Sequence, residues 1–251
     1  MKTSGPGAIV EWLIKPLLTA VWVVILAGLL VGAFSQQYSI AALRETVYRK
    51  FGQDYERRLS ASLLSELRGG GFTLFIRHAS RDGVDVPATS ALDWAFTVDP
   101  AAVPAGYRWS LCLNEFGRVE SGLLGQFFRR ASIPVGEVLA GPLCRTRETA
   151  ELSVGRVDRL EPSLVIIGGP NERAARTSGL KRLLEQAPRP GANRLLFSHS
   201  SVLETQGFAR LETEQAGMVV LQHTSHGLKV RAVVTLREMW YALLAAADPP
   251  R

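Results

Sequence analysis

The sequence lacks the charge pattern of a nucleic-acid-binding protein. Lysine and arginine outnumber aspartate and glutamate by 29 to 23, and the formal net charge is +6. However, no run of five like charges occurs, and no basic stripe alternates with aromatic residues, so nucleic acid is not an expected partner. A basic balance of this kind is also compatible with anionic lipid surfaces and with phosphorylated substrates.

Cysteine and histidine are scarce. Two cysteines and four histidines occur among the 251 residues. Cys112 and Cys144 could pair if this part of the chain is exported, but Cys144 stands beside Arg145 in a motif described below, and we expect free thiols. His223 and His226 have a spacing compatible with metal ligands. No cysteine or carboxylate accompanies them in the sequence, so no metal site is predicted there.

One long apolar run is present near the N-terminus. Pro16 to Phe34 contains 19 residues and no charge. A helix of this length spans roughly 28 Å, about the thickness of a hydrocarbon core. A cleaved signal peptide is the alternative, because Val31-Gly32-Ala33 resembles a cleavage site, but the apolar part of a signal peptide is usually shorter. We therefore expect an uncleaved transmembrane anchor.

The charges beside this run indicate its orientation. Lys2 and Lys15 precede it, whereas the other flank is uncharged until Arg44. Positive charge favours the cytoplasmic side of a membrane, although Arg49 and Lys50 weaken the asymmetry. We expect the catalytic part of the chain to lie outside the cytoplasm, in the periplasm.

The segment after the anchor has the spacing of a helix. From Leu43 to Leu67 an apolar residue recurs at every fourth position, which is typical of a helix that packs on a domain or on a partner helix. The chain is thus predicted to have four parts: a short N-terminal segment at 1–15, the anchor at 16–34, a helical linker at 35–70 and a catalytic domain at 71–247.

The first buried strand leads to an arginine and a histidine. Three glycines precede Phe72 to Ile76, an apolar or β-branched run, and Arg77 and His78 follow it. In an open α/β sheet such a strand end delivers side chains into the ligand crevice. An arginine binds two phosphate oxygens with fixed geometry, and a neutral imidazole nitrogen can attack phosphorus. The pair is suited to phosphoryl chemistry.

Two further strands lead to similar side chains. Val138 to Ala140 continues through Gly-Pro to Arg145, near the start of a helix where free backbone N–H groups also favour an anion. Arg194 to Ser198 ends at His199. Arg147, two residues after Arg145, is expected to face solvent. A single histidine at a strand end is often structural. Here, however, three separate strands each lead to a histidine or arginine suited to binding phosphate, and this repetition indicates a phosphate site.

The remaining segments are predicted to form the other helices, strands and loops of an α/β domain. An irregular stretch, Asp82 to Ser110, is long enough to be a functional insert. Helices are predicted at Asn114 to Ala131, with Val119 on the buried side, and at Glu172 to Gln186. Two strands are predicted in the tail, at Gly217 to Gln222 and Leu228 to Leu236.

Four motifs resemble those of the histidine phosphatase superfamily, whose fold is that of phosphoglycerate mutase. They keep the superfamily's order from about Gly71 to Leu236, although Ala79 and Ser200 stand where glycine is usual. The motifs are Phe75–Ala79, similar to the Arg-His-Gly signature; Leu113–Arg118, similar to Leu-Thr-x-x-Gly; Gly141–Ala150, similar to Ser-Pro-Leu-x-Arg-x-x-x-Thr-Ala; and Leu195–Ser200, similar to the second histidine motif. The resemblance implies a phosphoglycerate mutase-like three-layer α/β/α domain.

The resemblance also implies roles for the motif residues. His78 would be the nucleophile that becomes phosphorylated, while Arg77, Arg145 and His199 would bind the phosphate. The general acid would be Glu172, because Pro170–Arg173 is similar to the Leu-Asn-Glu-Arg of the mutase branch. Asp82 is the alternative acid, and Glu172 could instead be an ordinary first-turn glutamate. Arg81, Asp82 and Ser200, which adjoin the motifs, are assigned to substrate binding.

The function expected from these observations is a membrane-anchored phosphomonoesterase that needs no metal or other cofactor. The anchor favours a phosphorylated sugar or glycolipid near the membrane as substrate. A phosphoglycerate mutase-type phosphotransferase is a second interpretation, but its substrates are cytosolic. A third is an inactive module that binds a phosphorylated ligand without turnover.

Overall fold

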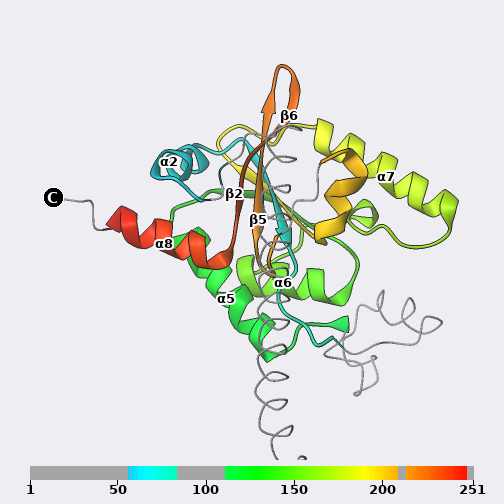
Figure 1. Cartoon of the computed structure of the whole chain (residues 1–251), viewed down its shortest axis with the longest axis horizontal. Coiled ribbons are helices and arrows are strands. Elements are labelled where there is room, and N and C mark those ends of the chain that lie inside the picture. Colours follow the sequence, from blue (N-terminus) through cyan, green and yellow to red (C-terminus); the bar gives the residue numbers. More distant parts are fainter. Residues whose placement is uncertain (1–55, 57, 84–110, 209–212, 248–251) are drawn as a thin grey trace, which may run out of the picture. The chain divides into compact units, whose positions relative to one another are not determined.

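The computed structural model describes residue 56 and residues 58–83, 111–208 and 213–247 (Figure 1). All of them belong to the unit Asp54–Arg251. The predicted anchor, most of the helical linker and residues 84–110 of the predicted insert lie outside the described residues. Within the described ranges, no helix is both long enough and apolar enough to cross a membrane.

A six-stranded mixed sheet forms the centre of the described part of the chain. Its order is β3-β2-β4-β1-β5-β6. The first four strands in this order are parallel, and β5 and β6 continue the sheet as an antiparallel hairpin. The strands are β1 Phe72–Arg77, β2 Val135–Ala140, β3 Arg159–Leu160, β4 Asn193–Ser198, β5 Met218–Thr224 and β6 Gly227–Val234.

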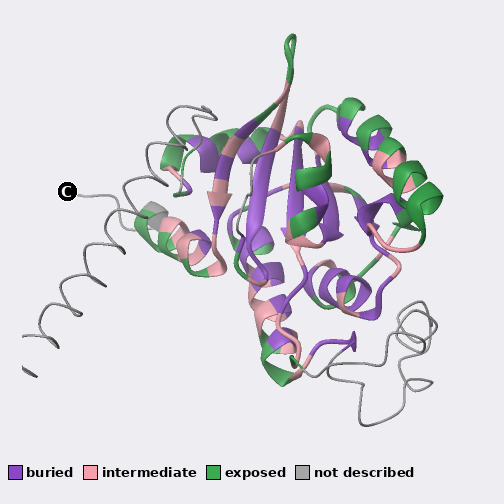
Figure 2. Ribbon diagram, turned by 45° about the vertical axis from the view of Figure 1, so that its right-hand side comes forward, coloured by how far each residue is buried: buried purple, intermediate pink, exposed green. Residues whose placement is uncertain are grey.

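Helices cover both faces of this sheet. Apolar side chains of α2, α5, α6 and α8 pack with one set of strand residues, and those of α7 and the short η3 and η4 pack with the other set. Figure 2 shows the strands as mostly buried between these layers. The helices are α2 Ala61–Gly69, α5 Glu115–Arg130, α6 Cys144–Val154, α7 Pro170–Glu185 and α8 Leu236–Ala247, with 3-10 turns η3 Pro162–Leu164 and η4 Ser200–Gln206.

The central strands read as continuous apolar runs because both of their faces are covered. In β1, Leu74 and Ile76 belong to one core and Phe75 to the other. This arrangement agrees with the predicted α/β class and with a three-layer α/β/α domain. Leu59, Leu63 and Leu67 are buried as well, so the described end of the predicted linker helix packs on the domain.

Two expectations about the elements were wrong in detail. Leu236 does not end a strand but begins α8. Its start is marked by a capping box, in which Thr235 and Glu238 exchange side-chain and backbone hydrogen bonds. Val119 is exposed, whereas Leu124, Phe127 and Phe128 provide the buried side of α5.

Candidate active site

His78 follows β1 at the centre of the sheet. Its backbone N–H donates to the carbonyl of Ser198 on β4, 3.0 Å away, and its carbonyl accepts from the N–H of Ala216, 3.2 Å away. The chain is therefore held on both sides, by the parallel neighbour β4 and by the segment that enters β5. The side chain is buried, with 5% of its surface exposed.

The hydrogen bonds of His78 define its tautomer. Nδ1 lies 2.8 Å from the carbonyl oxygen of Ala79. A carbonyl can only accept, so Nδ1 carries the proton and the neutral ring keeps its lone pair on Nε2. Burial, followed by the charge of Arg145, lowers the pKa of His78 to about 3, although the bond to Ala79 opposes this shift. At neutral pH His78 is an uncharged imidazole with a nucleophilic Nε2.

His199 faces His78 from the end of β4. The two ring centroids lie 5.0 Å apart, with the ring planes at 62°. Nε2 of His199 is buried and has no hydrogen-bond partner in the described part of the chain. Burial and then the charge of Arg145 hold the pKa of His199 well below its usual value. The structure thus brings together two histidines that are more than a hundred residues apart in the sequence.

Three arginines contribute positive charge to this pair. Arg145, Arg77 and Arg81 all lower the pKa of both histidines. Arg145 is half-buried near the start of α6. Desolvation followed by the charge of Arg81 lowers its own pKa to about 10. Burial also lowers the pKa of Arg77, again with a contribution from Arg81. The groups that shift the two imidazoles include no carboxylate among the described residues.

Several buried nitrogen atoms at this site have no hydrogen-bond partner within the described residues. They are Nε of Arg77, Nε of Arg145 and Nε2 of His199. Buried polar groups in proteins are nearly always hydrogen-bonded, and a cluster of unpaired guanidinium donors is costly. A tetrahedral anion supplies several acceptors and a compensating negative charge. The arrangement therefore fits a phosphoryl group.

Other contacts fix the orientation of the two motif arginines. Nη1 of Arg77 donates to the carbonyl of Thr213 at 2.6 Å. Nη1 of Arg145 lies 3.4 Å from the carbonyl of Leu111, close to the limit for a hydrogen bond. Arg77 is thus anchored more firmly than Arg145.

Two positioning residues were not singled out from the sequence. Thr149 Oγ1 accepts from the N–H of Ala79 at 3.1 Å and donates to the carbonyl of Arg145 at 2.6 Å. It joins the residue that holds His78 to the helix that carries Arg145. Glu120 Oε2 accepts from the N–H of Ser80 at 2.7 Å. The threonine in the Gly141–Ala150 motif was a signal for the first of these, because it stands one turn after Arg145.

The two candidates for the general acid have different surroundings. Glu172 lies in the first turn of α7, exposed, and its Oε2 accepts from the N–H of Gly169 at 2.8 Å. This contact caps the helix, and it is compatible with the alternative interpretation of Glu172 as an ordinary first-turn glutamate. Asp82 accepts from Nδ2 of Asn114 at 2.8 Å, beside the start of α5. Each remains a prediction as the acid, and the structure gives Glu172 a structural role already.

The remaining predicted substrate-binding residues lie next to the histidines. Arg81 contributes to the electrostatics of both rings, and its Nη1 donates to the carbonyl of Asp82. Ser200 directly follows His199 and begins η4. Their role in binding substrate remains a prediction.

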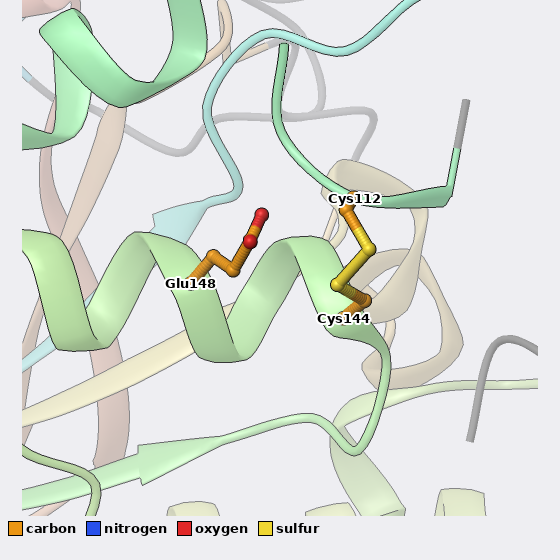
Figure 3. A group of neighbouring side chains, drawn as sticks. All are labelled: Cys112, Cys144 and Glu148. Atoms are coloured by element: carbon orange, nitrogen blue, oxygen red, sulfur yellow. A yellow bond between two sulfur atoms is a disulfide. The ribbon is translucent and has the colours of Figure 1, made fainter. Parts of the chain in front are cut away.

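Two expectations near Arg145 were wrong. Arg147 does not face solvent: only 7% of its surface is exposed, and burial lowers its pKa. The cysteines are not free thiols, because Cys112 and Cys144 form a disulfide with a Cα–Cα distance of 4.9 Å. Glu148 lies beside them (Figure 3), and these three side chains are the group with metal-ligand chemistry in the described ranges. In the disulfide the sulfurs are not thiolates, so this group does not offer a thiolate metal site.

His223 and His226 are not brought together as metal ligands. His223 Nε2 lies 3.2 Å from the hydroxyl of Thr73, while His226 is exposed in the turn between β5 and β6. Neither belongs to a metal-ligand group within the residues described.

Comparisons with known proteins give weak similarities. No family model and no curated protein matches the chain. Similar solved structures include the protein histidine phosphatase SixA complexed with tungstate, with a TM-score of 0.46 and 14% identity over 67% of this chain and 99% of that one. A phosphoserine phosphatase variant from Entamoeba histolytica in complex with phosphoserine gives 0.42 and 11% over 66% and 98%. Neither similarity is strong enough to assign the chain to a family.

Proposed function

We propose that the chain is a membrane-anchored phosphomonoesterase that forms a phosphohistidine on His78. One observation carries this proposal: the rings of His78 and His199 face each other with their centroids 5.0 Å apart. Burial and then the charges of Arg145, Arg77 and Arg81 lower the pKa of both rings and so keep them uncharged. An imidazole without a proton on Nε2 is a nucleophile, and the guanidiniums attract the phosphoryl dianion to it.

The reaction proceeds in two displacements. In the first, the Nε2 lone pair of His78 attacks phosphorus, the P–O bond of the ester breaks, and the leaving oxygen takes a proton. The arginines and His199 stabilise charge on the equatorial oxygens. In the second, water attacks the same phosphorus and gives a proton to the carboxylate that supplied the first one, and the P–N bond breaks to release phosphate and neutral His78. Asp82 or Glu172 supplies the first proton.

We also propose that this reaction takes place outside the cytoplasm on a phosphorylated sugar or glycolipid. The charges that flank the apolar run at 16–34 favour this orientation. The Cys112–Cys144 disulfide is a second, independent support, because disulfides persist in oxidising compartments. A reporter fused to the C-terminus tests the orientation: strong activity of a reporter that works only in the cytoplasm would contradict it.

Hydrolysis of p-nitrophenyl phosphate by the full chain in detergent tests the enzymatic proposal. The wild type should release phosphate, and His78→Ala should lose at least about a thousandfold in rate. His226→Ala is the matched control, since that histidine is exposed on the β5–β6 turn. Equal rates for the wild type and His78→Ala would overturn the proposal.

Binding and phosphate-transfer measurements on the same protein separate the alternative functions. Orthophosphate binding without turnover would indicate the binding module, and transfer of phosphate to an added alcohol in place of water would indicate the phosphotransferase. Replacing Asp82 by Asn and Glu172 by Gln identifies the acid. The variant that lacks it should slow substrates with poor leaving groups more than p-nitrophenyl phosphate.

A further inference from the structure

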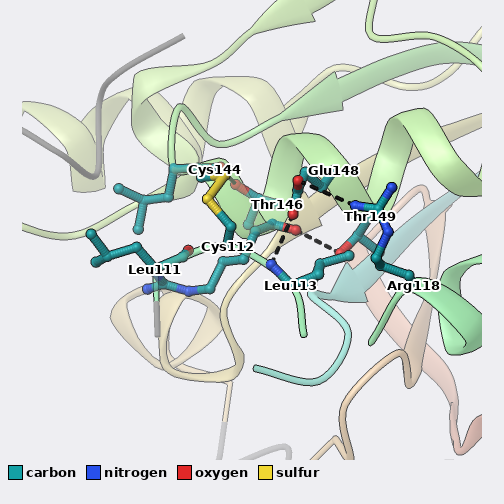
Figure 4. Close-up of a disulfide and its surroundings, with 10 residues drawn as sticks. Leu111, Cys112, Leu113, Arg118, Cys144, Thr146, Glu148 and Thr149 are labelled. Atoms are coloured by element: carbon teal, nitrogen blue, oxygen red, sulfur yellow. Dashed lines mark hydrogen bonds and ion pairs between the residues drawn. A yellow bond between two sulfur atoms is a disulfide. The ribbon is translucent and has the colours of Figure 1, made fainter. Parts of the chain in front are cut away.

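The Cys112–Cys144 disulfide lies next to the hydrogen bond that orients Arg145. Cys112 directly follows Leu111, whose carbonyl is the acceptor for Nη1 of Arg145, and Cys144 directly precedes Arg145. Each cysteine is therefore the sequence neighbour of one partner of that hydrogen bond, and the disulfide links the two segments directly beside it. Figure 4 shows the disulfide with Leu111 and Leu113 beside α6.

A second contact extends this attachment along α6. The N–H of Leu113 donates to Oε2 of Glu148 at 2.8 Å, and Oε1 of Glu148 lies 3.6 Å from Nη1 of Arg118. The attached segment is buried: Leu111, Cys112 and Leu113 expose at most 6% of their surface. Residues 111–113 are thus held against the first turns of the helix that presents Arg145.

Arg145 depends on this attachment more than Arg77 depends on its own surroundings. The bond from Arg145 to Leu111 is 3.4 Å long, whereas Arg77 has a 2.6 Å bond to Thr213. Nε of Arg145 is buried and has no partner in the described ranges. The α6 helix has no side-chain cap at Leu143. Among the described residues, few strong contacts therefore hold the guanidinium, and the covalent link limits how far Leu111 can move from it.

We propose that the disulfide positions Arg145 for binding of the phosphoryl group, which rests on the proposed function of the same site. Reduction by a dithiol breaks the S–S bond, adds one proton and one electron to each sulfur, and converts the dithiol into its own disulfide. Leu111 is then no longer tied to α6 by a covalent bond, and Arg145 loses its fixed orientation. The site keeps its residues but binds an anion more weakly.

Orthophosphate affinity of the full chain in detergent tests this positioning role. The dissociation constant for orthophosphate is measured for oxidised wild type, dithiol-reduced wild type and the double variant Cys112→Ser/Cys144→Ser. We expect about a tenfold weaker affinity in the reduced protein and in the double variant, and recovery when the reduced wild type is reoxidised. KM for p-nitrophenyl phosphate should rise in parallel.

The Arg145→Ala background separates positioning from general stability. If the disulfide acts through Arg145, reduction of Arg145→Ala should leave its orthophosphate affinity unchanged, because coupled residues are not additive. A disulfide that only stabilises the fold would lower the melting temperature of the wild type without changing orthophosphate affinity, and this result would overturn the proposal. Reduced wild type gives the answer even where the double variant does not fold.

The two proposals fail in different ways. If oxidised wild type binds orthophosphate but hydrolyses no ester, the enzymatic function fails while the loss of affinity on reduction still supports the positioning role. If ester hydrolysis is normal and reduction changes neither KM nor orthophosphate affinity, the positioning role is wrong and the function stands.

Discussion

At the scale of single residues, the carbonyl of Ala79 determines how His78 can react. It accepts from Nδ1 at 2.8 Å and so leaves Nε2 as the nitrogen with the lone pair. Burial, and then the nearby guanidiniums, keep the ring uncharged in the absence of an anion. A bound phosphoryl dianion would offset the positive charge of the guanidiniums. Without an anion, these like charges lie near one another uncompensated, which is electrostatically unfavourable.

The lowered pKa of His78 predicts that the stability of the protein depends on pH. The pKa of His78 is lowered to about 3, by burial first and then by Arg145, Arg77 and Arg81. Between that value and about 6.5, the unfolded chain binds a proton that the folded chain does not. The free energy of unfolding should therefore decrease as the pH falls through this window, by up to about 1.4 kcal/mol per pH unit for this residue.

Urea denaturation between pH 7 and pH 4 measures this effect. His78→Gln should reduce the dependence on pH, and His226→Gln, at an exposed position, should leave it as in the wild type. Identical pH profiles for all three proteins would show that His78 is not held neutral by its surroundings.

Thr149 provides a second prediction at this scale. Thr149→Val leaves the N–H of Ala79 without the acceptor that it has at 3.1 Å, so unfolding should become easier by about 1–3 kcal/mol. The turnover number should also decrease, because Ala79 holds His78. Thr149→Ser keeps the hydroxyl and is the control. Equal turnover numbers for the valine and serine variants would contradict a positioning role for this hydroxyl.

At the scale of elements, α5 approaches the loop after His78 closely enough to require glycine. A Cβ built on Gly117 would lie 2.1 Å from the carbonyl oxygen of Ser80, whereas one built on Gly122 would meet nothing within 4 Å. The glycine of the Leu113–Arg118 motif is thus explained by packing. The first turn of α5 and the loop after His78 are in backbone contact.

Gly117→Ala and Gly122→Ala form a matched pair on the same helix. Gly117→Ala should destabilise the protein by about 1–3 kcal/mol, because the loop must move away, and should lower the turnover number. Gly122→Ala should stabilise by up to about 1 kcal/mol, since alanine favours helix formation. Chemical denaturation and p-nitrophenyl phosphate turnover give both values. A Gly117→Ala protein as active and stable as the wild type would contradict the observed packing.

The sequence predicted the elements whose side chains repeat regularly. The continuous apolar runs of β1 and β4, the periodicity of α5, and Pro188 and Gly191 after α7 locate these elements to within a few residues. Short or atypical elements were missed for physical reasons. The two residues of β3 carry no pattern, and α8 follows β6 so directly that its first residue was read as strand. The sequence Thr235-Leu-Arg-Glu238 was the available signal for α8.

At the scale of the whole molecule, the site depends on contacts that only the tertiary fold creates. His78 lies beside His199 because β1 and β4 are neighbours in the sheet. The resemblance of the sequence motifs implied that both histidines belong to one site. The burial of Arg147 and the pairing of Cys112 with Cys144, 32 residues away, could not be read from local pattern. Both follow from how α6 is packed.

The disulfide also predicts a change in global stability. It links residues separated by 32 positions, and a loop of this size is expected to contribute about 4 kcal/mol to stability when closed. Adding a dithiol should therefore lower the urea midpoint of the wild type. The same dithiol should not affect Cys112→Ser/Cys144→Ser. An unchanged wild-type midpoint would mean that the cross-link is absent or contributes nothing.

In the proposed mechanism, His78 carries the phosphoryl group during turnover. Rapid quenching of the full chain with a labelled phosphate ester, followed by peptide mass spectrometry, tests this most directly. We predict a phosphoryl group on His78 that is lost in acid and kept in base, present in the wild type and absent in His78→Ala. Turnover of the ester with no phosphoryl group on His78 under any quench condition, or with the group on another residue, would contradict the proposed mechanism.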